Sequence, residues 1–179
     1  MAELATPEDL AAYLGTPPSN PDQASFALDA ASALVRGYCR WSITRDTDAV
    51  WTLDGQGGRL LALPTLHLVD VRAVVVRGKP VTDAEPAEAG MLYRRAGWPR
   101  GFGAIEVRAA HGYDPVPRDI VAVVCSLAGR VLSMASLSGV SSYRVGGVQI
   151  TYGRDGTDAT AFTLAERLAL DRHRLWDAG

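Results

Sequence analysis

One segment constrains the fold more than any other, an apolar stretch that follows a proline-containing turn. Residues 103–111 alternate in character as a strand does, and residues 112–116 are typical of a turn. From Ile120 to Leu132 the only charged residue is Arg130. A helix that is apolar on nearly every side must be surrounded by other helices or by partner subunits. This chain therefore needs helical neighbours for the segment, from itself or from another molecule.

Three further segments have the capping signals and apolar spacing of helices. Residues 6–9 combine a hydroxyl cap, a proline and two acids, and Gly15 ends the short helix that they begin. Residues 22–41 form a long alanine-rich helical pattern. Residues 163–166 are a capping box for a last helix that we expect to end at Trp176. Its apolar face would carry Leu164, Leu168 and Leu175, and its remaining surface Arg167, Asp171, Arg172, His173 and Arg174.

Short β-rich runs fill the chain between these helical patterns. No helical segment separates the runs between Ala49 and His111, which predicts a small antiparallel module at about 49–110. The glycine runs at 55–58 and 101–103 are interpreted as hairpin turns. Further on, Gly146-Gly147 between β-rich flanks predicts a hairpin arm at about 143–152.

Taken together, these patterns predict a mainly α fold with a β insertion, of the α+β class. We expect a helical bundle of about three to four helices that carries the β module at about 49–110 and the hairpin arm at about 143–152. With 179 residues the chain is expected to be one domain over 1–179. Its C-terminal part would be the hairpin plus a helix, at about 143–176.

Composition limits the classes of function. The formal net charge of −2 argues against a protein that binds nucleic acid by neutralising its backbone. Cys39 and Cys125 lie among apolar neighbours and are interpreted as reduced core thiols, with a disulfide or redox pair as the weaker alternative. The first ten residues place three acids before any basic residue, so no signal peptide is expected. The longest apolar run is far below the ~20 residues that span a bilayer, so we expect a soluble protein made in the cytoplasm, with no membrane partner.

The chain shows no catalytic, cofactor-binding or metal-binding constellation. Its three histidines do not have metal-ligand spacing. Cys125 with His111 would be a nucleophile and base only if the thiolate formed, which apolar surroundings disfavour. Between His111 and Pro117 the structural interpretation is preferred, because Gly112 permits a positive φ and the prolines stiffen the start of the helix. The prediction is a protein that is not an enzyme.

In order along the chain, these segments resemble the head–tail connector (adaptor) proteins of long-tailed bacteriophages and related gene-transfer particles. The residues that carry the resemblance are TPEDLAAYLG at 6–15, ASALVRGYCRW at 31–41, LPTLHLVDVRAVVVRGKPV at 63–81, VRAAHGYDPVPRDIVAVVCSLAGRVL at 107–132, YRVGGVQITYG at 143–153 and TLAERLALDRHR at 163–174. The turn at 111–117 is the most specific of them. The β-rich segment 49–106 is matched least, and there the family itself varies.

The resemblance implies a structural virion protein of the neck, at the head–tail interface. Its subunits would form a ring, usually of twelve, beneath the portal protein, with a free subunit that can be monomeric. Genomic DNA would pass through the ring without specific binding, and a stopper or tail-completion protein would dock below. We expect the last helix to contact the portal through Leu164, Leu168, Arg172 and Trp176. The hairpin would contact a neighbouring subunit or the next ring through Tyr143, Val145, Val148, Ile150 and Tyr152.

Three alternatives remain open at this point. The chain could be a stopper or tail-completion protein of the same neck. It could be a small phage-encoded hydrolase that uses His111 and Asp114. It could also be a DNA-binding module, which would show salt-sensitive binding to duplex DNA.

Overall fold

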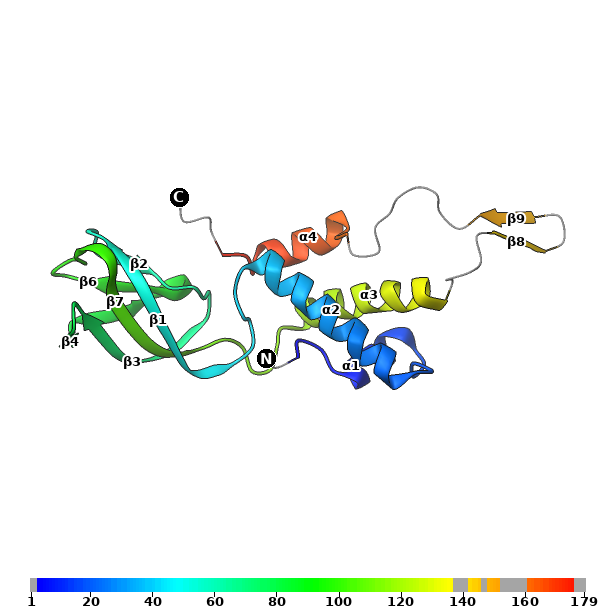
Figure 1. The fold of residues 1–179 in the computed structure, drawn as a ribbon, viewed down its shortest axis with the longest axis horizontal. Coiled ribbons are helices and arrows are strands. Elements are labelled where there is room, and N and C mark those ends of the chain that lie inside the picture. Colours follow the sequence, from blue (N-terminus) through cyan, green and yellow to red (C-terminus); the bar gives the residue numbers. More distant parts are fainter. Residues whose placement is uncertain (1–2, 137–141, 146–147, 152–160, 176–179) are drawn as a thin grey trace. The chain divides into compact units, whose positions relative to one another are not determined.

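The computed structural model describes residues 3–136, 142–145, 148–151 and 161–175, and the chain divides into two compact units (Figure 1). The helical unit comprises residues 1–38 and 117–172. The β unit comprises residues 39–116 and 173–179. Each unit is therefore assembled from segments that are far apart in the sequence. Among the described residues, no helix has the length and apolarity that crossing a bilayer requires.

Helices α1 (Pro7–Leu14), α2 (Pro21–Cys39), α3 (Arg118–Ser136) and α4 (Leu164–Asp171) occupy the predicted segments. The expected cap of α1 is confirmed in detail. The Thr6 hydroxyl accepts the backbone N–H of Asp9 at 3.1 Å, and the Asp9 carboxylate accepts that of Thr6 at 3.0 Å. Gly15 ends this helix in the left-handed conformation, with φ of 73°.

Helix α3 is the central helix of the helical unit. Both α1 and α4 pack against it. Helix α2 crosses it in Figure 1, and Gln23 of α2 borders the same hollow as Gly129 of α3. The helical neighbours that the apolar pattern requires are thus supplied by the same chain. The buried side chains of α3 are those of Ile120, Val121, Val123, Val124, Cys125, Leu127 and Ala128.

The last helix is shorter than expected. It ends well before Trp176, which itself lies outside the described residues. His173, expected on an exposed helical face, is buried, and its carbonyl oxygen accepts the indole N–H of Trp41 at 2.7 Å. The backbone N–H of Leu175 donates to the carbonyl oxygen of Cys39 at 3.0 Å. The helix stops because residues 173–175 are bound by the β unit, a long-range contact that local periodicity does not encode.

The described residues of the β unit form two antiparallel sheets. The larger has the order β1-β7-β3-β4, and the smaller has the order β2-β6-β5. Side chains from both sheets make one core, in which Ile105, Val107 and Leu92 are fully buried and Trp98 nearly so. The strands are β1 (Asp46–Gln56), β2 (Leu60–Ala62), β3 (Leu68–Val76), β4 (Lys79–Val81), β5 (Ala84–Ala87), β6 (Met91–Arg94) and β7 (Arg100–His111), and the short 3₁₀ turn η1 (Glu88–Gly90) precedes β6.

The prediction of a helical bundle is wrong, although the mixture of helices and antiparallel sheets fits the α+β class in part. The β segment is a unit with its own core. Its strands β1 and β7, of 11 and 12 residues, form one long ladder with register shifts. Glycines at 55, 101 and 103, which the sequence pattern assigned to turns, lie inside these strands. At Gly55 a Cβ would lie 1.8 Å from the carbonyl oxygen of Pro99, so the glycine permits close packing rather than a turn.

The turn between β7 and α3 has the structural role that was predicted for it. Gly112 adopts φ of 86°, and a Cβ there would lie 2.1 Å from the carbonyl oxygen of Thr44. Its backbone N–H donates to the carbonyl oxygen of His67 at 2.9 Å. The glycine therefore lets two neighbouring segments of the β unit approach each other.

Candidate interaction surfaces

Helix α4 is attached to α3 through a charged pair, the partly exposed Arg130 and the buried Glu166. Thr163 begins α4 with the predicted capping box, since its hydroxyl accepts the N–H of Glu166 at 3.2 Å and its own N–H donates to that carboxylate at 2.8 Å. The same carboxylate accepts hydrogen bonds from Arg130 at 2.8 Å and from Ser126 at 2.7 Å. Arg130 also donates to the carbonyl oxygen of Ala161 at 3.2 Å. The first turn of α4 is therefore fixed to α3 by one hydrogen-bond network.

The ionisation of Glu166 follows from this network. Burial alone would raise the pKa of this carboxyl group. Hydrogen bonds from Arg130, from the backbone N–H of Thr163 and from Ser126 outweigh burial, and the pKa falls from 4.5 to about 2. Glu166 is therefore charged at neutral pH, although only 8% of the residue is exposed.

The face of α4 that points away from the unit carries two large apolar side chains beside the exposed Arg167 and Asp171. Leu164 is 75% exposed and Leu168 is 62% exposed, and residues four positions apart share one face of a helix. Glu166 and Leu170 lie on the inward face instead, and Leu170 is fully buried. We expected the two leucines to share a face, and they do so. That face is presented outward, whereas the inward face carries the ion pair.

The structure does not place Arg172 and Trp176, the other residues predicted to bind the portal, on this face of α4. Arg172 follows α4, and its guanidinium lies 3.7 Å from the carboxylate of Asp119 in the first turn of α3. Trp176 lies outside the described residues. The structure thus brings together Leu164 and Leu168, which we call the leucine face of α4.

The predicted hairpin arm is present. Strand β8 (Ser142–Val145) pairs antiparallel with β9 (Val148–Thr151). Tyr143 is opposite Ile150, and Val145 is opposite Val148. Tyr152 and the two glycines between the strands lie outside the described residues.

All three histidines lie in the β unit and belong to one cluster of rings. His67 stacks on Tyr113 with centroids 4.4 Å apart, and His173 meets Tyr113 edge-on at 6.1 Å. The His111 ring lies 4.8 Å from that of Trp51. Spacing along the chain gives no sign of this cluster, because strand pairing and the C-terminal segment bring its members together.

The contacts of the histidine rings fit a packing role. Nδ1 of His67 lies 3.0 Å from the carbonyl oxygen of Gly112, and Nδ1 of His111 lies 3.2 Å from the Thr65 hydroxyl. Burial lowers the pKa of His111, against the opposing charge of Asp46, so the ring is neutral at pH 7. The residues that the structure describes contain no group of three side chains suited to a metal ion.

The residues considered for hydrolytic chemistry differ in their exposure and contacts. His111 is only 4% exposed and pairs with Thr65, whereas Asp114 is exposed in the turn. Cys125 lies in the helical unit, and burial raises the pKa of its thiol to about 11. Cys39 and Cys125 are both buried, and neither forms a disulfide among the described residues.

Two features of the surface have no counterpart in the sequence analysis. The β unit contains an apolar cavity of about 540 Å³, bordered by Leu53, Leu63, Met91 and Leu175 among others. Its lining comes from four separate parts of the chain, which explains why no local pattern predicts it.

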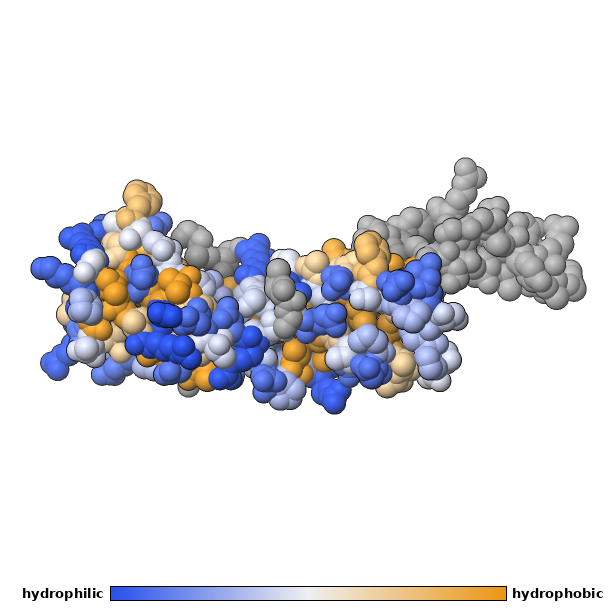
Figure 2. Space-filling view, turned by 60° about the horizontal axis from the view of Figure 1, so that its bottom comes forward, coloured by the Kyte–Doolittle hydropathy of each residue, from blue (hydrophilic) through white to orange (hydrophobic). Residues whose placement is uncertain are grey.

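Large apolar side chains also lie exposed on both units, and Figure 2 shows hydrophobic surface scattered among hydrophilic side chains. Phe102 is the most exposed of these at 96%, and Phe26 is 72% exposed.

Comparisons with known proteins find similar solved structures but no similar sequence. No protein-family model and no curated protein sequence matches this chain. Among solved structures, it is similar to the neck of an empty gene transfer agent particle with C6 symmetry, at 17% identity, 98% coverage of this chain, 95% of the other and a TM-score of 0.48. It is also similar to the neck of the native particle with C12 symmetry, at 14% identity, 98% and 94% coverage and a TM-score of 0.44. A third match is the virion of the native gene transfer agent particle, at 17% identity, 98% and 95% coverage and a TM-score of 0.46.

Proposed function

We propose that this chain is a structural protein of the neck of a phage-like virion, where it acts as the adaptor between portal and tail. Its subunits close into an oligomeric ring beneath the portal, and genomic DNA passes through the ring. A stopper or tail-completion protein docks on the opposite side. The chain acts by binding its neighbours, without catalysing a reaction.

The observation that carries this proposal is the leucine face of α4. A helix that only completes its own unit turns its apolar side inward. Helix α4 does the reverse with Leu164 and Leu168 and is held in place by the Arg130–Glu166 pair. Full burial of one leucine side chain stabilises a complex by roughly 1.5–3 kcal/mol. A partner that covers both leucines therefore gains from a surface that is already rigid.

The ordered resemblance of the sequence supplies the identity of that partner. Segments 6–15, 31–41, 107–132 and 163–174 resemble the connector family, and they contribute to α1, α2, α3 and α4 in that order. In the proposal, Leu164, Leu168, Arg172 and Trp176 contact the portal. The hairpin, with Tyr143, Val145, Val148, Ile150 and Tyr152, contacts a neighbouring subunit or the next ring.

The test uses the full-length chain and the portal protein of the same virion. A Leu164→Ser/Leu168→Ser variant removes the leucine face without touching the buried Leu170 or Glu166. We expect the unchanged chain to co-sediment with the portal and to appear as a ring beneath it by electron microscopy, and the variant to lose at least tenfold in portal affinity. A substitution test is sharper than deletion of residues 163–179, since deletion would also remove the buried Leu170.

A matched control is available in the same unit. Tyr13 and Phe26 are 54% and 72% exposed, so Tyr13→Ser/Phe26→Ser removes two exposed apolar side chains from α1 and α2. This control should bind the portal as the unchanged chain does. Equal binding by all three proteins would refute the assignment of the leucine face. Failure of the unchanged chain to bind the portal would refute the adaptor role itself.

A further inference from the structure

One end of the β unit is rich in basic side chains. Three connections meet there: the turn from β1 to β2, the turn from β3 to β4, and the loop from β6 to β7. Strand register fixes this arrangement, because Gln56 pairs with Arg100 and Val76 pairs with both Lys79 and Ile105. We call this end the basic tip, and its basic residues are Arg59, Arg77, Lys79, Arg94, Arg95 and Arg100.

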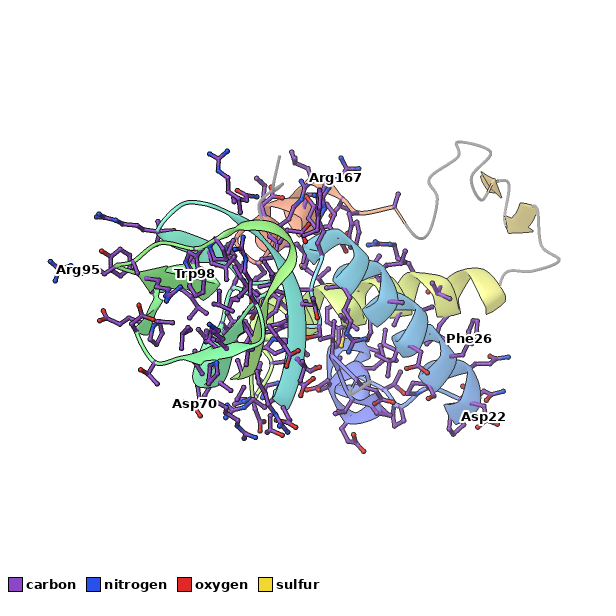
Figure 3. The ribbon with its side chains drawn as sticks, turned by 60° about the vertical axis from the view of Figure 1, so that its left-hand side comes forward. Asp22, Phe26, Asp70, Arg95, Trp98 and Arg167 are labelled. Carbon is purple, nitrogen blue, oxygen red and sulfur yellow. The ribbon has the colours of Figure 1, made fainter. Side chains whose placement is uncertain are left out.

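Backbone contacts hold the connections of the basic tip together. The Arg59 carbonyl oxygen accepts the backbone N–H of Arg94 at 2.9 Å and the indole N–H of Trp98 at 3.1 Å. The Arg77 guanidinium donates to the carbonyl oxygen of Arg100 at 2.9 Å. Arg95 points away from the unit in Figure 3, whereas Trp98 points into it. The basic side chains are thus carried on connections that hydrogen bonds join to one another.

The basic tip has a net positive charge, opposite in sign to the net charge of the whole chain. Segments 54–59, 77–85 and 94–103 carry six basic and three acidic side chains, although the chain as a whole has a net charge of −2. Two of the acids at the tip have partners: Asp83 pairs with Arg94 at 2.8 Å, and Asp54 accepts the N–H of Gly103 at 2.7 Å. Elsewhere on this unit Arg72 and Arg108 both pair with the single carboxylate of Asp48, which leaves one net positive charge there against three at the tip. Arg59, Lys79, Arg95 and Arg100 are exposed at the tip.

We propose that the basic tip binds the sugar–phosphate backbone of double-stranded DNA without sequence preference. Five of its six basic side chains are arginines, whose planar guanidinium matches phosphate oxygens in two parallel hydrogen bonds. Phe102, 96% exposed, lies two residues after Arg100 on the same strand. The inference rests on the proposed function for the source of the DNA, since a neck protein surrounds a passing genome. The net charge of −2 was interpreted as evidence against binding to the nucleic-acid backbone. The proposal corrects that interpretation, because a local basic surface is enough for contact with phosphates.

The test measures binding of the full-length chain to a fluorescein-labelled 30-base-pair duplex by anisotropy, at roughly 20 to 200 mM salt. The variant is Arg59→Gln/Lys79→Gln/Arg95→Gln, which keeps the paired Arg77 and Arg94. We expect micromolar binding at low salt, and a variant weaker by at least tenfold whose salt slope is smaller by about 2 to 3. The matched control Arg45→Gln/Arg118→Gln/Arg167→Gln removes the same charge from other places and should bind nearly as the unchanged chain does.

Three results would overturn the inference. The first is no duplex binding by the unchanged chain at 20 mM salt, and the second is equal weakening of both triple variants. The third is polyglutamate of matched charge displacing the chain as well as unlabelled duplex does, which would mean that any acidic polymer satisfies the tip. The adaptor proposal is tested separately, because portal binding through the leucine face involves none of the substituted tip residues.

Discussion

Single residues decide how α4 is held. Glu166 is a charged group on the inward face of an amphipathic helix, and it is tolerated there because Arg130, Ser126 and the N–H of Thr163 all donate to it. A buried carboxylate with this many donors favours its charged form strongly. The stability of α4 is therefore linked to pH.

The first prediction concerns that linkage. The pKa of Glu166 lies at about 2 in the folded chain and at about 4.5 when unfolded, so its contribution is complete above pH 5 and is lost as the pH falls toward 2. Glu166→Gln should lower the free energy of unfolding by roughly 2 kcal/mol at pH 7, because the partly buried Arg130 loses its charged partner. Urea unfolding at pH 7 and pH 3 should show the difference from the unchanged chain shrinking at the lower pH. The exposed Glu85→Gln serves as control, and a difference independent of pH would contradict the mechanism.

A second prediction concerns Gly112. Its φ of 86° and the 2.1 Å approach to the Thr44 carbonyl oxygen leave no room for a Cβ. Gly112→Ala should therefore cost more than about 2 kcal/mol of stability. Gly78 has a similar φ of 76° but no atom within 4 Å of a Cβ, so Gly78→Ala should cost only about 1 kcal/mol. Thermal unfolding of both variants separates backbone strain from steric overlap, and equal costs would show that the overlap is relieved.

At this scale the sequence predicted what is local. The hydroxyl cap at Thr6 and the capping box at Thr163 were predicted correctly because their partners lie three residues away. The inward position of Glu166 could not be predicted, since its partner Arg130 belongs to another helix. The burial of His173 was missed for the same reason.

Among the elements, helix α4 has one face that is buried in its own unit and a second face that we propose binds a partner. Leu170 is fully buried, whereas Leu164 and Leu168 are mostly exposed. The third prediction follows from this contrast. Leu170→Ala should destabilise the chain by about 2–5 kcal/mol, whereas Leu164→Ser/Leu168→Ser should change stability by about 1 kcal/mol or less. Urea unfolding of both variants provides the measurement, and a large cost for the serine pair would mean that the leucines support the fold rather than a partner.

The strands show where pattern reading is weakest. The existence of an antiparallel β region and of the hairpin was predicted from alternation and from Gly146-Gly147. The lengths of β1 and β7 were not, because the glycines inside their ladder are the usual marks of turns. Gly55 is needed for close approach to Pro99 instead. Glycine alone therefore does not distinguish a turn from a tightly packed strand.

At the scale of the whole molecule, both units are built from discontinuous segments. The sequence predicted most elements, but it did not show that residues 39–116 have a core of their own with residues 173–175 attached. That division depends on long-range contacts such as the bond from Trp41 to the His173 carbonyl oxygen. The apolar cavity beside Leu175 depends on the same segment.

The fourth prediction tests this attachment. A chain that ends at Arg172 loses the acceptor for the Trp41 indole and the donor to the Cys39 carbonyl oxygen. Leaving these buried groups unpaired costs about 1–3 kcal/mol each. Hydrogen exchange should therefore accelerate in residues 39–45 while the middle of α3 stays protected. A chain that ends at Leu175 is the control and should exchange as the full chain does; faster exchange in α3 as well would mean that the segment supports the whole fold.

The return of residues 173–175 to the β unit has a practical consequence for exchanging parts between related proteins. A graft of residues 39–116 alone would lack residues 173–175, which follow α4. The hydrogen bonds of these residues to Cys39 and Trp41 would then be lost. A working chimera has to import a matching C-terminal end together with the graft. Evolution of this protein is subject to the same coupling, so changes around Trp41 are expected to be accompanied by changes at residues 173–175.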